Sequence, residues 1–243
     1  APALTLNLDG ITGTTNIDNA AASVTDLTIN TSGTASSTVV TGANVTGLTV
    51  GAGAKLTVSG MAALKTATVT GAGDVVLGDI SDNATTVTAG DASGAISATV
   101  DGTKAAVTTG GGKDAITVDT VGLSKAISLG GGDDTLTLSN AAAATTATAA
   151  VTGGDGNDTL AINLATAVAR GVDTNFTAAL TSFERLALTD AVNAQIEADN
   201  LGFNHVTFNA AATSTLNDVA ANSTTVLTVA TNALTIVLDD ATG

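Results

Sequence analysis

Three aspartates, Asp114, Asp134 and Asp158, each follow a glycine-rich turn and precede a short apolar segment. Their spacing is 134 − 114 = 20 and 158 − 134 = 24 residues. Glycines let backbone carbonyls approach an ion closely, and Ca²⁺ prefers six to eight oxygen ligands drawn from carboxylates and carbonyls. If equivalent turns stack one strand spacing apart, about 4.8 Å, neighbouring turns can share ions. The turns themselves contain Gly110, Gly111, Gly112, Gly130, Gly131, Gly132, Gly153, Gly154, Asp155 and Gly156.

The third turn matches a known motif at every fixed position. Residues 153–161, GGDGNDTLA, fit the nonapeptide G-G-x-G-x-D-x-U-x, and residues 109–117 and 129–137 lack only its first glycine. The chain therefore resembles the RTX calcium-binding repeat family, whose fold is a parallel β-roll. The resemblance implies that Asp114, Asp134 and Asp158 are carboxylate ligands, that the glycine turns supply carbonyls, and that Ca²⁺ is the bound ion.

The motif weakens outside these three turns. Upstream, Gly94 is expected at the position of the ligand aspartate, and Asp91 is a candidate donor to an ion at the first coil boundary. Lys55 argues against calcium in its own coil. Asp101 and Asp119 recur on the opposite edge, where we expect them to cap turns, so that ions line one edge only.

Apolar residues recur with the period that stacked coils require. One set of anchors is spaced by twenty residues, a second set falls between them, and Leu160 continues the first set after four extra residues. Two strands per coil follow, with apolar side chains inside and Thr or Ser outside. The sequence predicts an all-β, right-handed parallel β-roll or β-helix of about 20 residues per coil. The two sets are Leu56, Val76, Ile96, Ile116 and Leu136, and Val87, Val107 and Ile127.

The chain divides into three parts on this pattern. Residues 1–50 are strand-rich solenoid coils, 51–164 are the β-roll with the candidate calcium turns, and 165–243 are an irregular β-solenoid segment containing all four phenylalanines. We expect the Ala/Thr-rich segment 141–150 to bulge from the roll. Residues 175–183 are expected to begin as a short helix, and 206–208, 226–229 and 234–238 to form strands.

The composition restricts the classes of partner. Twenty-two acidic and seven basic residues give a net charge of −15, which argues against nucleic acid or an anionic membrane surface as a direct partner. Aromatic residues are 2% of the chain and cysteine is absent, which suits a thin stacked core stabilised by metal rather than by disulfides. No apolar run is long enough to insert into a bilayer. The chain is expected to be a mature segment or a fragment of a longer polypeptide.

The residues of a catalytic site are scarce, and we expect no enzyme activity. The chain has one histidine, His205, and two arginines, Arg170 and Arg185, with no nucleophile motif, phosphate loop or zinc spacing around them. Arg185 is expected to pair with the adjacent Glu184. Polysaccharide lyases, which are often β-helices, need a base and a cationic partner that this pattern does not bring together.

The chain is acidic, has no cysteine, is rich in Thr, Ala and Gly, and contains a few RTX turns. In these respects it resembles the crystalline surface-layer proteins that Gram-negative bacteria export by type I secretion. That resemblance implies a secreted, self-assembling structural protein at the cell surface, whose main partner is itself. Any contact with a cell-surface polysaccharide is expected through a part outside this chain. Two alternatives stay open: the repeat region of a calcium-dependent RTX adhesin, and the non-catalytic β-roll module of a secreted RTX hydrolase.

Overall fold

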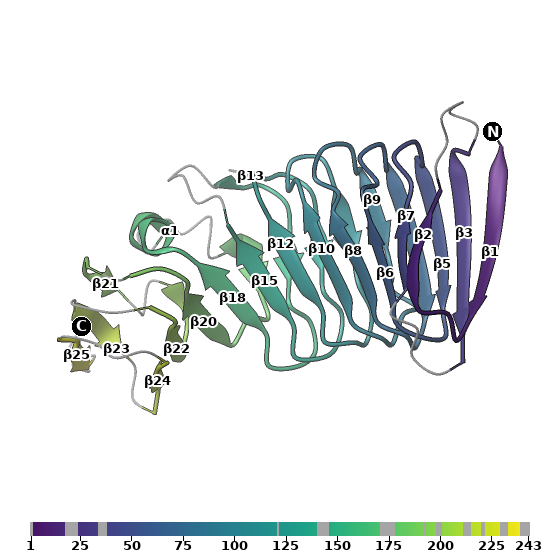
Figure 1. Cartoon of the computed structure of the whole chain (residues 1–243). Helices are drawn as coiled ribbons and strands as arrows, with labels where there is room; N and C mark the ends of the chain where they lie inside the picture. The colour runs from purple at the N-terminus through teal and green to yellow at the C-terminus, as the bar shows by residue number, and fades with distance from the viewer. Residues whose placement is uncertain are drawn as a thin grey trace.

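The computed structural model describes residues 2–17, 24–33, 38–120, 122–139, 146–170, 178–191, 193–197, 201–210, 215–219, 222–228 and 233–238. These residues form an all-β parallel solenoid. Every strand pair is parallel, and consecutive strands of the chain alternate between two long sheets. Figure 1 shows the strands side by side along the long axis, with the N-terminus at one end and the C-terminal strands at the other. The predicted fold class, with two strands per coil, is confirmed.

The first long sheet has nine strands in the order β1-β3-β5-β7-β9-β11-β14-β17-β19. It crosses the expected boundary at residue 50 without a break, because β5 includes that residue. The bounds are β1 (Ala3–Asp9), β3 (Asp26–Ser32), β5 (Gly47–Ala52), β7 (Thr66–Gly71), β9 (Thr86–Thr88), β11 (Ala106–Thr108), β14 (Ile127–Ser128), β17 (Val151–Thr152) and β19 (Leu180–Thr181).

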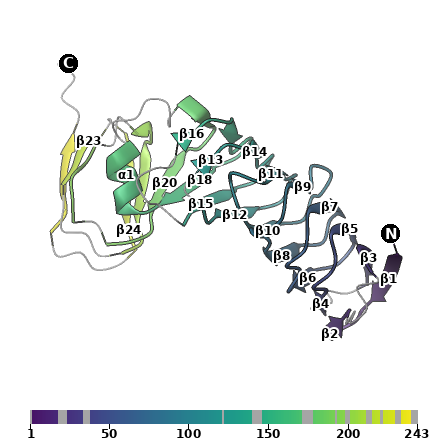
Figure 2. The ribbon, with the colours of Figure 1, turned by 90° about the horizontal axis from the view of Figure 1, so that it is seen from above.

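The second long sheet has eleven strands and runs further toward the C-terminus. Figure 2, the view from above, shows the two sheets facing each other along the solenoid. The bounds are β2 (Gly13–Asn16), β4 (Thr38–Thr41), β6 (Leu56–Ser59), β8 (Val75–Asp79), β10 (Ile96–Val100), β12 (Ala115–Val118), β15 (Thr135–Leu138), β18 (Thr159–Ile162), β20 (Arg185–Leu188), β22 (His205–Phe208) and β24 (Thr224–Leu227).

Two short sheets complete the described strands. β13 (Gly122–Leu123) pairs with β16 (Thr146–Ala147), and β21 (Ile196–Glu197), β23 (Thr215–Val219) and β25 (Thr235–Leu238) form a sheet of three. The segment 141–150 was expected to bulge from the roll. Its first part, 141–145, lies outside the described residues, and its later part contains β16. The strands expected at 206–208, 226–229 and 234–238 are confirmed in their described parts by β22, β24 and β25.

The chain also forms one described helix, α1 (Leu164–Arg170), which the sequence reasoning missed. The side-chain oxygen of Asn163 accepts the backbone N–H of Thr166 at 2.9 Å, an N-cap that the sequence Asn163-Leu164-Ala165-Thr166 could have signalled. Of the short helix expected to begin residues 175–183, positions 175–177 lie outside the described residues, whereas residues 178 and 179 are helical and lead directly into β19, as expected. No helix in the described part of the chain is both long and apolar enough to cross a membrane.

The core is a continuous column of small and medium apolar side chains. Alternate residues of the strands point inward, as in β10, where Ile96, Ala98 and Val100 are buried. Phe208 is the largest of the fully buried side chains, and Phe183 and Phe203 pack against the same core. The described phenylalanines therefore fill the interior where the coils become irregular, as expected, while Phe176 lies outside the described residues.

The coil length is less uniform than the twenty-residue anchors predicted. Val75, not Val76, pairs with Leu56 and Ile96 and is fully buried, whereas Val76 faces outward. Ile116 stacks on Ala98 rather than on Ile96. The anchors Val87, Val107 and Ile127 do stack as predicted. A fixed spacing fails in the first set because its coils differ in length and because the pairing of β8 with β10 shifts register between Ser97 and Ala98.

The outward face of the nine-stranded sheet carries hydroxyl side chains in one continuous row. Each strand contributes a residue at the same register position, and neighbours across the sheet can pack their methyl and hydroxyl groups together. β-branched threonine suits an extended, half-exposed backbone, so this row stabilises the strands while keeping the surface polar. The row consists of Thr5, Thr28, Thr49, Thr68, Thr88, Thr108, Ser128, Thr152 and Thr181.

The turns stack so closely that they leave no space for side chains at several glycines. A Cβ added at Gly154 would overlap the carbonyl oxygen of Gly130, and one at Gly156 would overlap that of Gly132. Gly154 also has φ of +112°, a conformation that L-residues rarely adopt. Gly111 differs, because it has open space around its Cβ position and no positive φ.

We expect Gly154→Ala to destabilise the fold strongly and Gly111→Ala to change it little. Backbone overlap and positive φ together cost about 2–4 kcal/mol, whereas an unstrained surface change stays within about 0.5 kcal/mol. Urea unfolding followed by circular dichroism measures both. Equal midpoints for the two variants would contradict the close stacking described above.

Candidate metal centre

The three predicted ligand aspartates are stacked one above another at one edge of the solenoid, where the turns lead into β12, β15 and β18. Their side chains point into the interior. Asp114, Asp134 and Asp158 are only 1%, 1% and 0% exposed. Because Thr135 pairs with Ala115 and Thr159 pairs with Thr135, the aspartates that precede these residues are also in register. The structure thus brings together the three carboxylates that the sequence singled out, although they are 20 and 24 residues apart in the chain.

One oxygen of each carboxylate has a clear partner. The backbone N–H of Ile96 donates to Oδ1 of Asp114 at 2.6 Å, and that of Asp114 donates to Oδ1 of Asp134 at 2.7 Å. The N–H of Asp134 then donates to Oδ1 of Asp158 at 2.8 Å. Each carboxylate therefore joins its own coil to the one before it by a charge-assisted hydrogen bond.

The other oxygen of each carboxylate has none. Oδ2 of Asp114, Asp134 and Asp158 is buried and accepts no hydrogen bond. A buried carboxylate oxygen without a partner costs free energy unless it is protonated or meets a cation. Three such atoms lie in adjacent coils, so this unpaired oxygen is a feature that repeats with the coil.

The electrostatics agree with this interpretation. Burial, opposed by the N–H of Asp114 and reinforced by the charges of Asp114, Asp158 and Asp133, raises the pKa of Asp134 to about 7. Burial also raises the pKa of Asp114, and burial with the charges of Glu184, Asp133 and Asp155 raises that of Asp158. Burial, together with neighbouring negative charges at Asp134 and Asp158, therefore opposes ionisation of these carboxylates.

A fourth carboxylate, missed in the sequence reasoning, continues the file. Oε2 of Glu184 accepts the backbone N–H of Asp158 at 2.8 Å, and Arg185 pairs with Thr159, which places Glu184 in register with Asp158. The expected ion pair between Glu184 and Arg185 is wrong, because the two side chains belong to opposite faces of the strand and form no salt bridge among the described residues. We call Asp114, Asp134, Asp158 and Glu184 the carboxylate row.

A sequence signal for Glu184 did exist. Asp158-Thr-Leu-Ala-Ile and Glu184-Arg-Leu-Ala-Leu both place an acid two residues before a leucine, which is followed by alanine and a further apolar residue. The glycine pattern is lost in the later turn, where Ser182 has φ of 54° in a position that stacks against Gly153. A search for glycines alone therefore overlooks this coil.

At its other end the row stops at an apolar residue. A Cβ at Gly112 would overlap the carbonyl of Gly94, so Gly94 corresponds to the turn glycine and not, as expected, to the ligand aspartate. Ile96 occupies that inward position beneath Asp114, because Ser97 pairs with Ala115. Asp91 is exposed in the preceding turn and lies outside the row. The coil boundary below Asp114 thus offers no second buried carboxylate.

Backbone oxygens are the remaining donors that an ion would need. Oδ2 of Asp158 lies against Gly153, so that a Cβ there would touch it. Among the described residues, no group of three or more His, Cys, Asp or Glu side chains could hold a metal on its own. An ion between two coils would therefore need turn carbonyls as well as carboxylates, which fits the Ca²⁺ preference for mixed oxygen ligands in a glycine-rich turn.

Asp101, on the opposite edge, has a different chemistry, whereas Asp119 on that edge also leaves one buried oxygen, Oδ1, without a hydrogen-bond partner. Oδ1 of Asp101 accepts the N–H and hydroxyl of Thr103, and its Oδ2 forms a salt bridge of 3.0 Å with Lys104. Although burial acts to raise it, these hydrogen bonds lower the pKa of Asp101 to about 2. Asp101 therefore caps its turn, as expected, and its carboxylate already has partners.

No family model, curated protein or solved structure matches this chain. The interpretation of the carboxylate row accordingly depends on its own geometry.

We expect the metal-free protein to lose stability as the pH rises from 5 to 8. An acid whose pKa is higher in the folded state than in the unfolded chain stabilises the fold fully below its unfolded value, about 4. That contribution disappears as the pH rises through about 7, the value for Asp134. The loss amounts to about 1.4 kcal/mol per pH unit for each such group. Urea midpoints measured in a chelator test this, and midpoints that rise with pH would contradict it.

Proposed function

We propose that this chain is a structural calcium-binding solenoid of a self-assembling bacterial surface layer. The observation that carries the calcium part is the file of unpaired, buried Oδ2 atoms of Asp114, Asp134 and Asp158. The adjacent pairs of the carboxylate row would hold ions between coils: Asp114 with Asp134, Asp134 with Asp158, and Asp158 with Glu184. Turn carbonyls at Gly110, Gly130 and Gly153 would supply further oxygens.

A cation explains the row better than protons do. Protonation would leave each second oxygen as a buried hydroxyl that still needs an acceptor, and Asp134 would lose its proton above about pH 7. Magnesium fits less well, since it demands a small octahedral shell and retains several waters. Calcium tolerates the irregular mixture of carboxylates and carbonyls that these turns present.

The energies involved are large for so thin a core. A ligand that binds only the folded state at a hundredfold excess over Kd stabilises it by about 2.7 kcal/mol per site. Two or three sites are comparable with the whole stability of an ordinary domain, about 5–15 kcal/mol. Calcium in this proposal therefore acts as a folding ligand rather than a catalytic one.

Two surface properties support self-assembly. The net charge of −15 keeps copies apart until cations neutralise it. On β24 and β25, the last described strands of their sheets, apolar side chains are exposed, with Leu238 at 67%. Such residues gain free energy when another surface covers them. Export to the cell surface and assembly of copies into a layer are the parts of the proposal that the resemblance to surface-layer proteins supports.

We expect Asp134→Asn to have opposite effects with and without calcium. Asparagine keeps the oxygen that accepts the Asp114 N–H but removes the charge, so the variant should be as stable as wild type or more stable in a chelator at pH 8. In saturating calcium it should lose about 3–5 kcal/mol, because Asp134 belongs to two of the proposed ion sites. Thermal unfolding in both conditions measures the change, with the exposed Asp82→Asn as the control of equal charge.

The same samples test assembly. Light scattering should rise when calcium is added to wild type and to Asp82→Asn, fall on chelation, and rise less in Asp134→Asn. Wild-type protein that melts and scatters identically in calcium and in chelator would contradict the whole proposal. A calcium-dependent melting temperature without any assembly would contradict the surface-layer part alone and favour the adhesin or module alternatives.

A further inference from the structure

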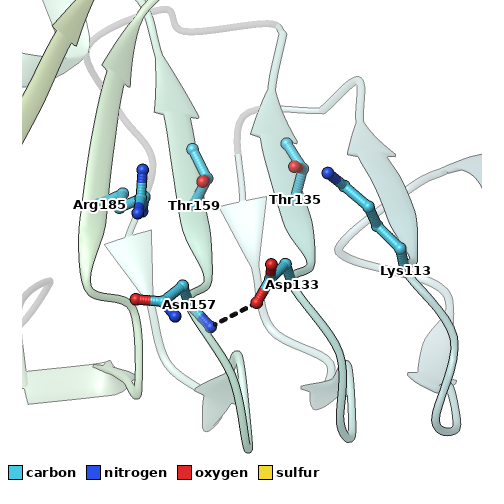
Figure 3. A pocket seen from close by; sticks show the side chains of 6 residues that line it. All are labelled: Lys113, Asp133, Thr135, Asn157, Thr159 and Arg185. Carbon is cyan, nitrogen blue, oxygen red and sulfur yellow. Dashed lines mark hydrogen bonds between the residues drawn. The ribbon is translucent and has the colours of Figure 1, made fainter. Parts of the chain in front are cut away.

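An open pocket lies on the outer face of the eleven-stranded sheet, directly outside the carboxylate row. Its volume is about 170 Å³, and polar or charged side chains line it. Figure 3 shows Lys113 and Arg185 on its two sides, Thr135 and Thr159 between them, and Asp133 and Asn157 beside the turns. We call it the outer pocket, and it is defined by Lys113, Asp133, Thr135, Asn157, Thr159 and Arg185.

The repeat itself builds this pocket. Lys113, Asp133 and Asn157 each stand one residue before a buried aspartate, and Thr135 and Thr159 each stand one residue after one. Because side chains alternate along an extended chain, burying the aspartates sends both flanking residues outward. The equivalent residues of consecutive coils then lie one strand spacing apart, so that four coils, from that of Lys113 to that of Arg185, form one surface site.

The charge of this pocket is unusual for the molecule. Two of the seven basic residues of the chain face it, and among the described residues neither Lys113 nor Arg185 forms a salt bridge. Asp133 uses one oxygen to accept the backbone N–H of Asn157 at 3.0 Å. The pocket therefore presents two free cations, a carboxylate acceptor, an amide and two hydroxyls to solvent.

We propose that the outer pocket binds an acidic oligosaccharide, one whose sugars carry carboxylates. Arginine pairs with a carboxylate in a planar, two-bonded geometry, and lysine attracts a second one as a point charge. Lys113 and Arg185 belong to coils three strand spacings apart, about 14 Å between backbones, a span that two or three sugar units can bridge once the side chains reach inward. Sugar hydroxyls both donate and accept, which suits Asp133, Asn157 and the two threonines.

Other anions fit these groups less well. Inorganic phosphate offers at most two O–H donors near neutral pH, and its negative charge would repel that of Asp133. Nucleic acid would find no aromatic side chain in the pocket on which to stack a base. A carboxylated sugar chain alone combines two separated negative charges with hydroxyl donors between them.

The experiment is calorimetric titration of the full chain, in calcium, with trigalacturonate. Its methyl ester provides a neutral ligand of the same shape, and inorganic phosphate provides a simple anion. We expect trigalacturonate to bind, the ester to bind at least tenfold more weakly, and excess phosphate not to displace the saccharide. Arg185→Gln and Lys113→Gln should each weaken binding at least tenfold, whereas Lys125→Gln, an equal change of charge on an exposed lysine outside the pocket, should not.

The outcomes separate this proposal from the calcium proposal. All three lysine and arginine variants should keep the calcium-dependent rise in melting temperature, which also shows that they fold. Absence of trigalacturonate binding in protein that still responds to calcium would overturn the saccharide site alone. If Lys125→Gln weakened saccharide binding as much as Arg185→Gln, or if phosphate displaced the saccharide, the binding would be an unspecific attraction of anions. Either result would also overturn the saccharide site.

Discussion

The main physical constraint on this structure is the placement of four carboxylates side by side at one edge of a narrow apolar core, where their charges repel each other. Asp114, Asp134, Asp158 and Glu184 follow one another at the spacing of parallel strands, and the three aspartates are almost completely buried. Water cannot screen them, and backbone N–H groups satisfy only one oxygen of each. A divalent cation between each pair would remove both the repulsion and the unpaired oxygens. If such a cation is bound as we propose, order in this half of the solenoid would depend on its supply.

The alternation of an extended chain connects the interior of this edge to its surface. The residue that faces inward in each turn is a carboxylate, and its two neighbours face outward into the outer pocket. The pocket can keep its shape only if successive turns remain in register, which the carboxylate row with its bound ions would enforce. A protein that binds acidic saccharides through such a surface would also suit the adhesin alternative, so cell-surface assembly and saccharide binding are compatible uses of one edge.

The sequence predicted the fold because small apolar residues and turn glycines recur at nearly constant spacing. It predicted the file of Asp114, Asp134 and Asp158 because their turns share a motif. It failed where stacking, rather than sequence spacing, decides the register. Val75 replaces Val76 as the buried residue, and Ile96 rather than Gly94 lies beneath Asp114, because the coils differ in length and the pairing of β8 with β10 shifts register. Glu184 was missed since its turn has lost its glycines, although the strand after it kept its pattern.

The most direct measurement is crystallography of the calcium-loaded protein with anomalous scattering from the metal. The account predicts anomalous peaks between the coils of the carboxylate row, about 2.3–2.6 Å from Oδ2 of Asp114, Asp134 and Asp158, with turn carbonyls completing each shell. Calcium found only at exposed acids such as Asp82 or Asp91, with these three oxygens still unpaired, would contradict the central claim.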